Sequence, residues 1–561
     1  MISSGKRWWV LSSLLALVVF LVFVDCVPNA FVLDDEPVIL KNTYLTSVKY
    51  IPNLLTENIL AGAGVTGNTY RPFEMLTHFL DVQLFGYQPW GHHLSSVLWH
   101  VACAVALFHM LAGLFPLGAA FLAAAFFSLH PLHSGIVAIV SGRADTLVML
   151  FIFLGLWAFR RNLWLSLLCA ALAIGSKESG VLFPILLVLY DRATGPPSPR
   201  LRHLPFWLLA ELYVIARLTV LNFHNTLNFY DTPDPFTEHF LYRVCTYVTT
   251  LSKGVVLWLQ PNDLHPLRDW PMFTSVAQPA VWLSLIAVML LALTAFRMRR
   301  SRPRVAAGIA WFFVATLPTS NLAAIIYARL YDHWFLLPGV GLLIAATDLC
   351  ASAWTRWTRP RLLITVAALV AIACVSVVTA RYNLVWRTPI SLNTYILAWE
   401  PRSAKTAHNL ALAYAEQGDH AKAIALYRRA LSLRDDFTRS HYQLGREYAQ
   451  MGDGDRALQQ FQRTVELDPR FSYAWLEIGN LLLARGDLEE AAVIFQRVIG
   501  MVSPVLVEAG RLPRNAEAFT GLAQVYVATQ QVEAADTVLE AGARRFPGHP
   551  DIMRFHPRET R

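Results

Sequence analysis

The stretch TRSHYQLGREYAQMGDGDRALQQFQRTVELDPRF, residues 438–471, is one unit of a repeat that decides how the C-terminal part of this chain folds. The unit recurs with a period of thirty-four residues from Ala404 onward. The recurring positions are a glycine (Gly418, Gly452, Gly486), an alanine (Ala423, Ala457, Ala491), an aromatic residue (Tyr427, Phe461, Phe495) and an aliphatic residue (Leu410, Leu444, Ile478). We expect the glycine at a turn that tolerates no side chain, the alanine where two helices pack closely, and the aromatic ring between units.

This pattern resembles the tetratricopeptide repeat (TPR), a helix–turn–helix unit. The expected repeats are 404–437, 438–471, 472–505 and, after an insertion near 503–514, a degenerate copy at 516–549. In the fourth copy Leu522, Gln530 and Ala535 take the three roles, and a half-repeat near 390–401 precedes the array. Stacked repeats leave a concave groove, so we predict that it binds a peptide or protein; a spacer or a dimerisation surface is the other interpretation.

The rest of the chain is too apolar for an ordinary soluble protein. Of 561 residues, 55% are hydrophobic and 15% are charged, and charges are scarce between residues 8 and 380. The formal net charge is +8, but the basic residues cluster at the ends of apolar segments. That is the positive-inside pattern of membrane proteins and excludes a nucleic-acid partner.

About eleven apolar segments are long enough to span a bilayer. They lie near 8–24, 93–113, 117–131, 144–159, 162–175, 179–190, 204–221, 277–296, 304–321, 333–350 and 361–380. Lys6 and Arg7 place the N-terminus in the cytoplasm, and we interpret the apolar segment 244–259 as re-entrant or interfacial. An odd number of spans puts the repeats, and the long first loop 27–92, on the periplasmic or endoplasmic-reticulum luminal side.

The predicted fold class is therefore all-α. A polytopic membrane domain, residues 1–385, precedes a TPR α-solenoid, residues 386–561.

Ionisable residues gather at the outer ends of these spans, where their insertion cost makes a function the default hypothesis. The candidates are Asp34, Asp35, His93, His130, His133, Arg143, Asp145, Lys177, Glu178, Arg329 and His333. The two adjacent acids suit a general base or a divalent-metal site, although a solvated turn is the plain alternative. Arg143 suits a phosphate, or a local salt bridge to Asp145. Together these groups favour a reaction on an amphiphile with an anionic headgroup.

Several stretches, in order along the chain, resemble the transmembrane and tetratricopeptide-repeat family of GT-C glycosyltransferases. They include FVLDDEPVILKN (31–42), YRPFEMLTHFLDVQLFG (70–86), FFSLHPLHSGIVAIVSGRADTL (126–147), GSKESGVLFPILLVLYD (175–191) and YARLYDHWFLLPGVG (327–341). Tyr327 stands where the family commonly has a Glu before the Arg, so only Arg329 is carried over. That departure and the short repeat array suggest a bacterial relative, in the inner membrane.

The resemblance implies transfer of a sugar from a polyprenyl-phosphate carrier to a protein Ser or Thr hydroxyl, as in protein O-mannosyltransferases. Asp34 or Asp35 then acts as the base in one inverting displacement, and Arg143, Lys177 and Arg329 bind the donor phosphate. His93, His130, His133, His333, Asp145 and Glu178 orient the substrate or the cations. A Mg²⁺ or Mn²⁺ ion at Asp34 and Asp35 stays open. Two other hypotheses are a membrane-anchored TPR scaffold for envelope assembly and a lipid or polysaccharide transporter.

Overall fold

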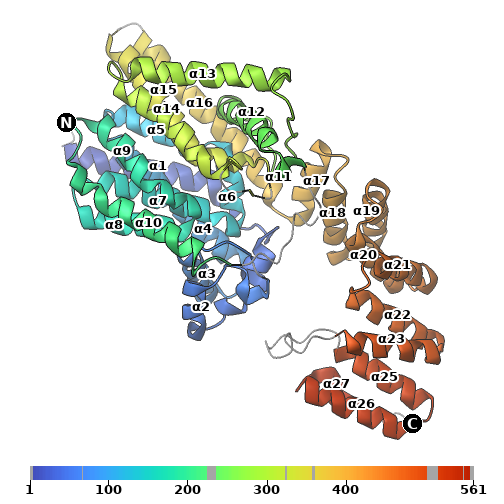
Figure 1. Cartoon of the computed structure of the whole chain (residues 1–561). Coiled ribbons are helices and arrows are strands. Elements are labelled where there is room, and N and C mark those ends of the chain that lie inside the picture. Colours follow the sequence, from blue (N-terminus) through green and yellow to red (C-terminus); the bar gives the residue numbers. More distant parts are fainter. Residues whose placement is uncertain are drawn as a thin grey trace. The chain divides into compact units, whose positions relative to one another are not determined.

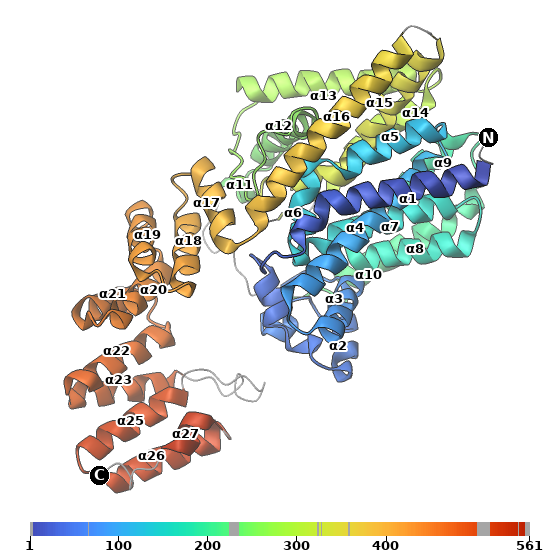
Figure 2. The same ribbon diagram turned by 180° about the vertical axis from the view of Figure 1, so that it is seen from behind.

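The computed structural model describes residues 4–65, 67–223, 235–322, 325–326, 328–356, 360–501, 516–547 and 549–555. Within these residues every regular element is a helix (Figures 1 and 2), which confirms the all-α prediction. The chain divides into two compact units, Met1–Leu392 and Asn393–Arg561. Tyr327 and the predicted insertion 503–514 lie outside the described residues.

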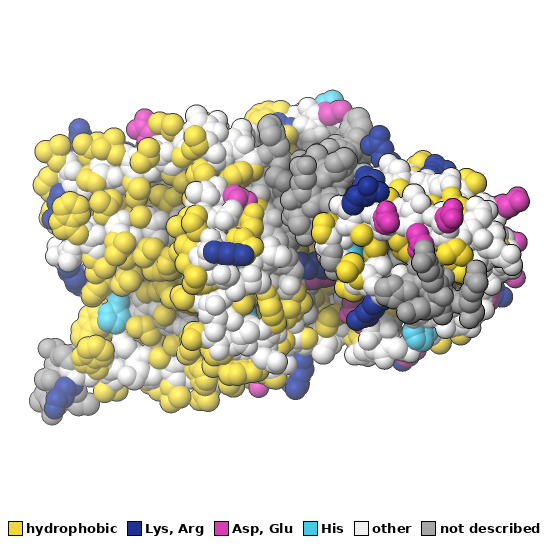
Figure 3. All heavy atoms as spheres, turned by 90° about the horizontal axis from the view of Figure 1, so that it is seen from below, with side chains coloured by type: hydrophobic (Ala, Val, Ile, Leu, Met, Phe, Trp, Pro, Cys, Tyr) yellow, Lys and Arg dark blue, Asp and Glu magenta, His cyan; other side chains and the backbone are white. Residues whose placement is uncertain are grey.

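The first unit is a bundle of long helices. In chain order they are α1 (Ser4–Phe23), α4 (Pro89–Leu111), α5 (Leu117–Ser128), α7 (Arg143–Ala158), α8 (Leu163–Ser176), α9 (Phe183–Thr194), α10 (Leu204–Leu218), α12 (Phe240–Leu259), α13 (Pro279–Met298), α14 (Pro303–Thr316), α15 (Leu336–Arg356) and α16 (Pro360–Asn383). Helix α4 packs against α1 and α7, and α14 packs against α15. Hydrophobic side chains cover much of the visible face of this bundle in Figure 3, as expected for a surface that faces lipid.

Six helical segments in the described part of the chain are long and apolar enough to cross a membrane. They are Lys6–Cys26, Pro89–Leu111, Val140–Ala158, Pro279–Met298, Asp332–Trp354 and Arg361–Trp386. The pair Leu117–Ser128 and Pro131–Ala138, bent by 48°, makes a seventh if it is one span. Pro131 lacks an amide hydrogen and so breaks this helix. The expected count of eleven is not confirmed, although each predicted segment overlaps a helix.

The long loop after α1 folds around a small apolar core of its own. It contains α2 (Ile51–Thr56) and α3 (Pro72–Phe85), which starts with a proline at the position where a missing amide hydrogen costs nothing. The buried side chains of this core are Val38, Ile39, Leu45, Leu54, Met75, Phe79 and Val82, with Val140 from the segment before α7. The loop is therefore fixed against the start of α7.

The second unit is a stack of helix pairs. After α17 (Pro389–Trp399), which spans the unit boundary, the helices are α18 (Ala404–Glu416), α19 (His420–Leu433), α20 (Thr438–Gln450), α21 (Gly454–Leu467), α22 (Ser472–Arg485), α23 (Leu488–Gly500), α25 (Glu517–Ala528), α26 (Val532–Arg545) and α27 (Pro550–Arg554). The recurring alanines and aromatic rings of the first three repeats are fully buried. Ala535 is fully buried as well, so the roles predicted for the alanine and the aromatic ring are confirmed.

The turn glycines are needed for a reason that differs from the predicted one. Gly418, Gly452 and Gly486 have φ of +80°, +79° and +86°, the left-handed region that favours glycine. A Cβ atom at each would meet no atom within 4 Å, so the constraint is backbone conformation and not lack of space. Gln530 takes the same place in the fourth repeat with φ +61°, which strains a residue that carries a side chain.

Candidate functional site

The two adjacent acids near the end of α1 lie in a strained loop. Leu33, just before them, has φ +52°, a conformation that non-glycine residues adopt rarely and mostly where the surroundings enforce it. Asp35 then precedes a short helical turn, Glu36–Leu40. The two neighbouring side chains have different surroundings: Asp34 is exposed and Asp35 is fully buried.

Asp35 joins the loop to the segment that leads into α7. One carboxylate oxygen accepts a hydrogen bond from the Val32 amide at 3.1 Å, and the other accepts from the Ser141 amide at 2.7 Å. Burial raises the pKa of Asp35 to about 6, and the two amide donors offset only part of that rise. Asp35 is thus shielded by protein, whereas the carboxylate of Asp34 lies at the surface of the loop.

Arg143, at the start of α7, is fully buried and fully engaged. Its guanidinium lies 2.6 Å from a carboxylate oxygen of Asp81 on α3. It also donates to Thr77 at 3.2 Å, to Ser96 at 3.2 and 3.3 Å, and to the His92 carbonyl at 3.0 Å. Its ion-pair partner is therefore Asp81 and not Asp145, and the phosphate role stays a prediction.

Asp145 and Glu178 each hold a cation, as the sequence suggested. The Lys177 ammonium lies 2.6 and 2.7 Å from the two carboxylate oxygens of Asp145. Glu178 pairs with Arg71 at 3.2 Å. Burial raises the pKa of Glu178, but the charge of Arg71 and its hydrogen bonds outweigh burial and leave that pKa below its usual value.

Arg71 is a member of this network that sequence reasoning missed. Besides Glu178, it lies 3.6 Å from Glu74, whose carboxylate is buried and lies 3.6 Å from His78. The available signal was its place immediately before Pro72, the first residue of α3, because a proline disfavours the helical conformation in the residue that precedes it and so marks Arg71 as the start of the helix. Together, Arg71, Lys177, Asp145 and Glu178 join the starts of α3 and α7 to the end of α8.

Three of the predicted histidines lie inside the helical packing. The ring of His130 lies against that of Trp258, tilted by 34° with the centroids 4.3 Å apart, and its Nδ1 accepts from the Leu132 amide. The His133 ring lies 4.7 Å from that of His100. The ring nitrogens of His93 and His133 have no hydrogen-bond partner among the described residues. The backbone of Ala30 and that of Phe127 nevertheless approach the rings of His93 and His133, respectively, so a role for these two histidines in orienting the substrate stays a prediction.

Arg329 belongs to a second charged network, and His333 lies between the two networks, close enough to Asp145 and Lys177 for their charges to act on its ring. The Arg329 guanidinium donates to the Trp270 carbonyl and lies 3.7 Å from Asp269. The His333 ring stacks on Tyr331 at 5.5 Å. Between them, Asp332 binds Arg268 at 2.7 Å, a residue that the sequence interpretation did not single out.

A divalent-metal site at Asp34 and Asp35 stays a prediction. No group of three His, Cys, Asp or Glu side chains in the described ranges could hold a metal ion. Both oxygens of Asp35 accept amide hydrogens, so a metal ion there would take most of its oxygen ligands from water or from the phosphate of a substrate.

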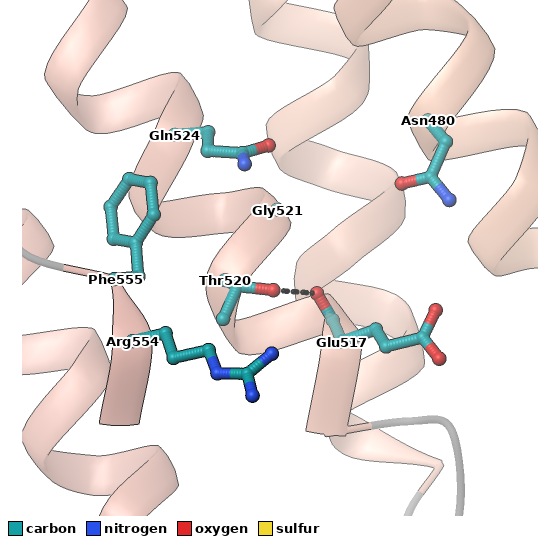
Figure 4. Close-up of a pocket in the computed structure, with 7 residues that line it drawn as sticks. All are labelled: Asn480, Glu517, Thr520, Gly521, Gln524, Arg554 and Phe555. Carbon is teal, nitrogen blue, oxygen red and sulfur yellow. Dashed lines mark hydrogen bonds between the residues drawn. The ribbon is translucent and has the colours of Figure 1, made fainter. Parts of the chain in front are cut away.

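Described residues of the repeat unit line two surface pockets among others. The first, of about 380 Å³, is lined by Asn480 of α22, Glu517, Thr520, Gly521 and Gln524 of α25, and Arg554 and Phe555 at the end of α27 (Figure 4). The second, of about 660 Å³, lies among α21, α22 and α23, with Trp475 and Glu490 among its lining residues. The first presents amide, hydroxyl and charged groups together with one aromatic ring.

The sequence of the second unit matches three profiles of the tetratricopeptide repeat, at residues 402–470, 442–504 and 482–554. A crystal structure of the MamA protein is 17% identical and aligns with 28% of this chain and 80% of its own, with a TM-score of 0.25. With the apolar bundle, the repeats define the class: an integral membrane protein that carries tetratricopeptide repeats.

The chain is homologous to proteins named protein O-mannosyl-transferases of the TMTC type. It is 26% identical to human TMTC4 over 474 residues, covering 71% of this chain and 63% of that protein. It is 26% identical to human TMTC1 over 472 residues, covering 72% and 53%. Drosophila melanogaster Tmtc1 is 28% identical over 292 residues, covering 45% and 33%. The chain thus spans less than two thirds of the length of these relatives.

Proposed function

We propose that this protein is a membrane glycosyltransferase that moves a hexose, mannose by analogy with its relatives, from a polyprenyl-phosphate carrier to a Ser or Thr hydroxyl of a protein. The observation that carries the proposal is the different placement of the two adjacent acids: Asp34 is exposed, and Asp35 is buried with both carboxylate oxygens hydrogen-bonded. The names of the homologous proteins and the cations near the starts of α3 and α7 support it.

Asp34 is the general base in this proposal. A base must reach the acceptor hydroxyl, and Asp34 is exposed whereas Asp35 is buried with both oxygens engaged. The acceptor oxygen attacks the anomeric carbon, its proton moves to Asp34, and the bond from that carbon to the phosphate oxygen breaks. The electron pair leaves with the polyprenyl phosphate, and this single displacement inverts the anomeric centre.

Cations stabilise the charge that grows on the leaving phosphate. Arg329 and Lys177 are the best suited, because their side chains are 32% and 16% exposed, whereas Arg143 is fully buried. In this proposal Arg143 instead holds the segment that contains Ser141, and so supports Asp35. His93 and His133 orient the sugar in this proposal.

The repeat unit binds the acceptor protein. The pocket bounded by Asn480, Gln524 and Phe555 presents two primary amides and a ring, groups that bind the backbone and side chains of an extended peptide. The N-terminus lies in the cytoplasm, and the repeats and the Asp34 loop lie on the opposite side, in the periplasm or the endoplasmic-reticulum lumen.

The test compares Asp34→Asn with Asp35→Asn in the purified full-length chain. With polyprenyl-phosphate mannose and a Ser/Thr-rich peptide, product is detected by mass spectrometry. We expect Asp34→Asn to lower the transfer rate by roughly 10²–10⁴-fold, the usual contribution of a general base, without lowering the melting temperature.

Asp35→Asn should act mainly through stability, because its carboxylate holds two segments together. In cells, Asp34→Asn should fail to restore the glycan that is lost when the gene is deleted. Full restoration by Asp34→Asn would show that this carboxylate is not catalytic and would favour the scaffold hypothesis.

A further inference from the structure

The segment NDLHPLRDW, residues 262–270, follows α12 and carries charged groups that the proposed reaction does not use. We name residues 263–270 the strap, because they bind two points of the segment 329–332, which precedes α15. The first point is Asp332. Arg268 donates two parallel hydrogen bonds to the Asp332 carboxylate, from Nε at 2.7 Å and from Nη2 at 2.9 Å.

The ion pair between Arg268 and Asp332 is shielded from solvent, and its geometry is specific. The side chains of Arg268 and Asp332 are 8% and 9% exposed, and the His265 amide donates to the same carboxylate at 2.8 Å. A fork-to-carboxylate pair fixes both distance and orientation, which a single point charge does not. The segment around Asp332 is therefore held in one orientation.

The second point is Arg329. Its Nη1 donates to the carbonyl of Trp270, at the end of the strap, and its guanidinium lies 3.7 Å from Asp269. The guanidinium of Arg329 also lies over the ring of Phe236, 5.9 Å from its centroid, and the side chain is 32% exposed. Arg329 is thus held by the strap and still reaches solvent, whereas Arg143 is fully buried.

The strap itself rests on a rigid support. Trp270 donates from Nε1 to the Thr249 hydroxyl on α12 at 3.1 Å. Helix α12 in turn packs tightly on the start of α15: a Cβ on Gly339 would lie 2.1 Å from the Trp258 ring. Trp258 also donates from Nε1 to the Phe335 carbonyl at 2.9 Å. Helix α12, on which the strap rests, is thus packed closely against the start of α15, which leaves little room for α12 to shift.

We propose that the strap positions Arg329 to bind the phosphate of the lipid carrier, and that Arg268 is the positioning residue that fixes it. The inference rests on the proposed function, because it assumes that the ligand is a lipid-linked phosphate. Arg268 does not touch that phosphate; it acts through Asp332 on the orientation of the segment that carries Arg329.

The test measures binding of undecaprenyl phosphate to the full-length protein in detergent, with undecaprenol as the uncharged control. Binding is followed as the rise in melting temperature with lipid concentration. We expect the wild type to respond to the phosphate only. Arg268→Lys keeps the charge and loses the fork, and should raise the dissociation constant about tenfold, a change of ~1.4 kcal/mol, with little change in melting temperature without lipid.

Arg160→Lys is the matched control, because Arg160 makes a similar pair with Asp191 at 2.8 Å, away from the strap. It should bind the phosphate like the wild type. If Arg268→Lys does not fold, Asp332→Asn is measured in its place and should weaken binding to the same degree. Unchanged binding in the folded variant overturns the positioning role and leaves the proposed function standing. A wild type that does not distinguish the phosphate from the alcohol overturns both.

Discussion

At the scale of single residues, the buried carboxylate of Asp35 makes the stability of the membrane unit depend on pH. Burial raises its pKa to about 6, above the value of about 3.9 in an unfolded chain. The folded state therefore binds this proton more tightly than the unfolded state. The resulting stabilisation is fully present below about pH 4 and is lost as the pH rises through about 6.

We predict that Asp35→Asn removes this pH dependence. Between pH 4 and pH 7 the free energy of unfolding of the wild type should fall by on the order of 3 kcal/mol relative to that of the variant. This follows because the pKa of Asp35 differs by about two between the folded and the unfolded state. Thermal unfolding of both proteins across that range measures the difference. Parallel melting curves for the two proteins at every pH would mean that Asp35 is not a titrating buried group.

The buried pair of Arg143 and Asp81 gives a second prediction. Removing one partner of a buried ion pair costs about 3–5 kcal/mol, whereas replacing both by apolar residues is often near neutral. Arg143→Met should therefore destabilise the protein strongly, and Arg143→Met with Asp81→Leu should recover most of that loss.

The same double variant separates two roles for Arg143. If its guanidinium serves only to hold α3, α4 and α7 together, the folded double variant should bind undecaprenyl phosphate like the wild type. Lost phosphate binding in a double variant with wild-type stability would instead support the donor-binding role predicted from the sequence.

At the scale of helices and turns, the fourth repeat carries a strained residue where the other three carry glycine. Gln530 has φ +61°, and the left-handed conformation costs a non-glycine residue about 1–2 kcal/mol. Gln530→Gly removes this strain from the folded state. Glycine also raises the conformational entropy of the unfolded chain, which offsets part of the stabilisation. We predict a net stabilisation of about 0.5–1 kcal/mol, measured by denaturant unfolding of the repeat unit.

The matched control is the reverse change, Gly452→Gln, at φ +79°. It should destabilise the unit by a similar amount, since open space surrounds that position and only the backbone conformation is at issue. Equal stability of both variants and the wild type would show that the backbone adapts at these turns.

The elements that were predictable from the sequence are those set by local pattern. The apolar segments predicted helices of the first unit, six or seven of which are long and apolar enough to cross a membrane, and the thirty-four-residue period predicted the helix pairs of the repeat unit. The segment 244–259 lies within the continuous helix α12, Phe240–Leu259, which is not among the six helical segments long and apolar enough to cross a membrane; its re-entrant or interfacial placement stays a prediction. The sequence pattern did not reveal that α12 is buried against α15 through Gly254 and Gly339.

The geometry of the candidate site was not predictable because its partners are distant in sequence. The Asp35 carboxylate meets an amide 106 residues away, and Arg268 meets a carboxylate 64 residues away. The sequence offered Asp34 and Asp35 as equals, and only tertiary packing makes one buried and the other exposed. The sequence likewise offered Asp145 as the ion-pair partner of Arg143, whereas the structure pairs Arg143 with Asp81 on a different helix.

At the scale of the whole molecule, the second unit has a hydrophobic core of its own. The buried cluster runs through the repeats from Ala411 to Val525, and a second cluster surrounds Phe519 and Phe546. All of these residues belong to the unit Asn393–Arg561. Because each repeat is stabilised by its neighbours in the stack, residues 393–561 should fold without the membrane unit.

We predict that this fragment is soluble, helical and unfolds cooperatively on heating, as followed by circular dichroism. Phe461→Ala removes a fully buried ring and should cost about 3–5 kcal/mol. Val493→Ala, at a side chain 64% exposed, is the control and should change stability by less than about 0.5 kcal/mol. Gradual, non-cooperative melting of the wild-type fragment would mean that the repeats depend on the rest of the chain.

A fragment that unfolds cooperatively, in contrast, allows acceptor binding to be measured apart from catalysis. A loss of transfer caused by Asp34→Asn could then be assigned to the chemical step, because the acceptor would still bind to an unchanged repeat unit.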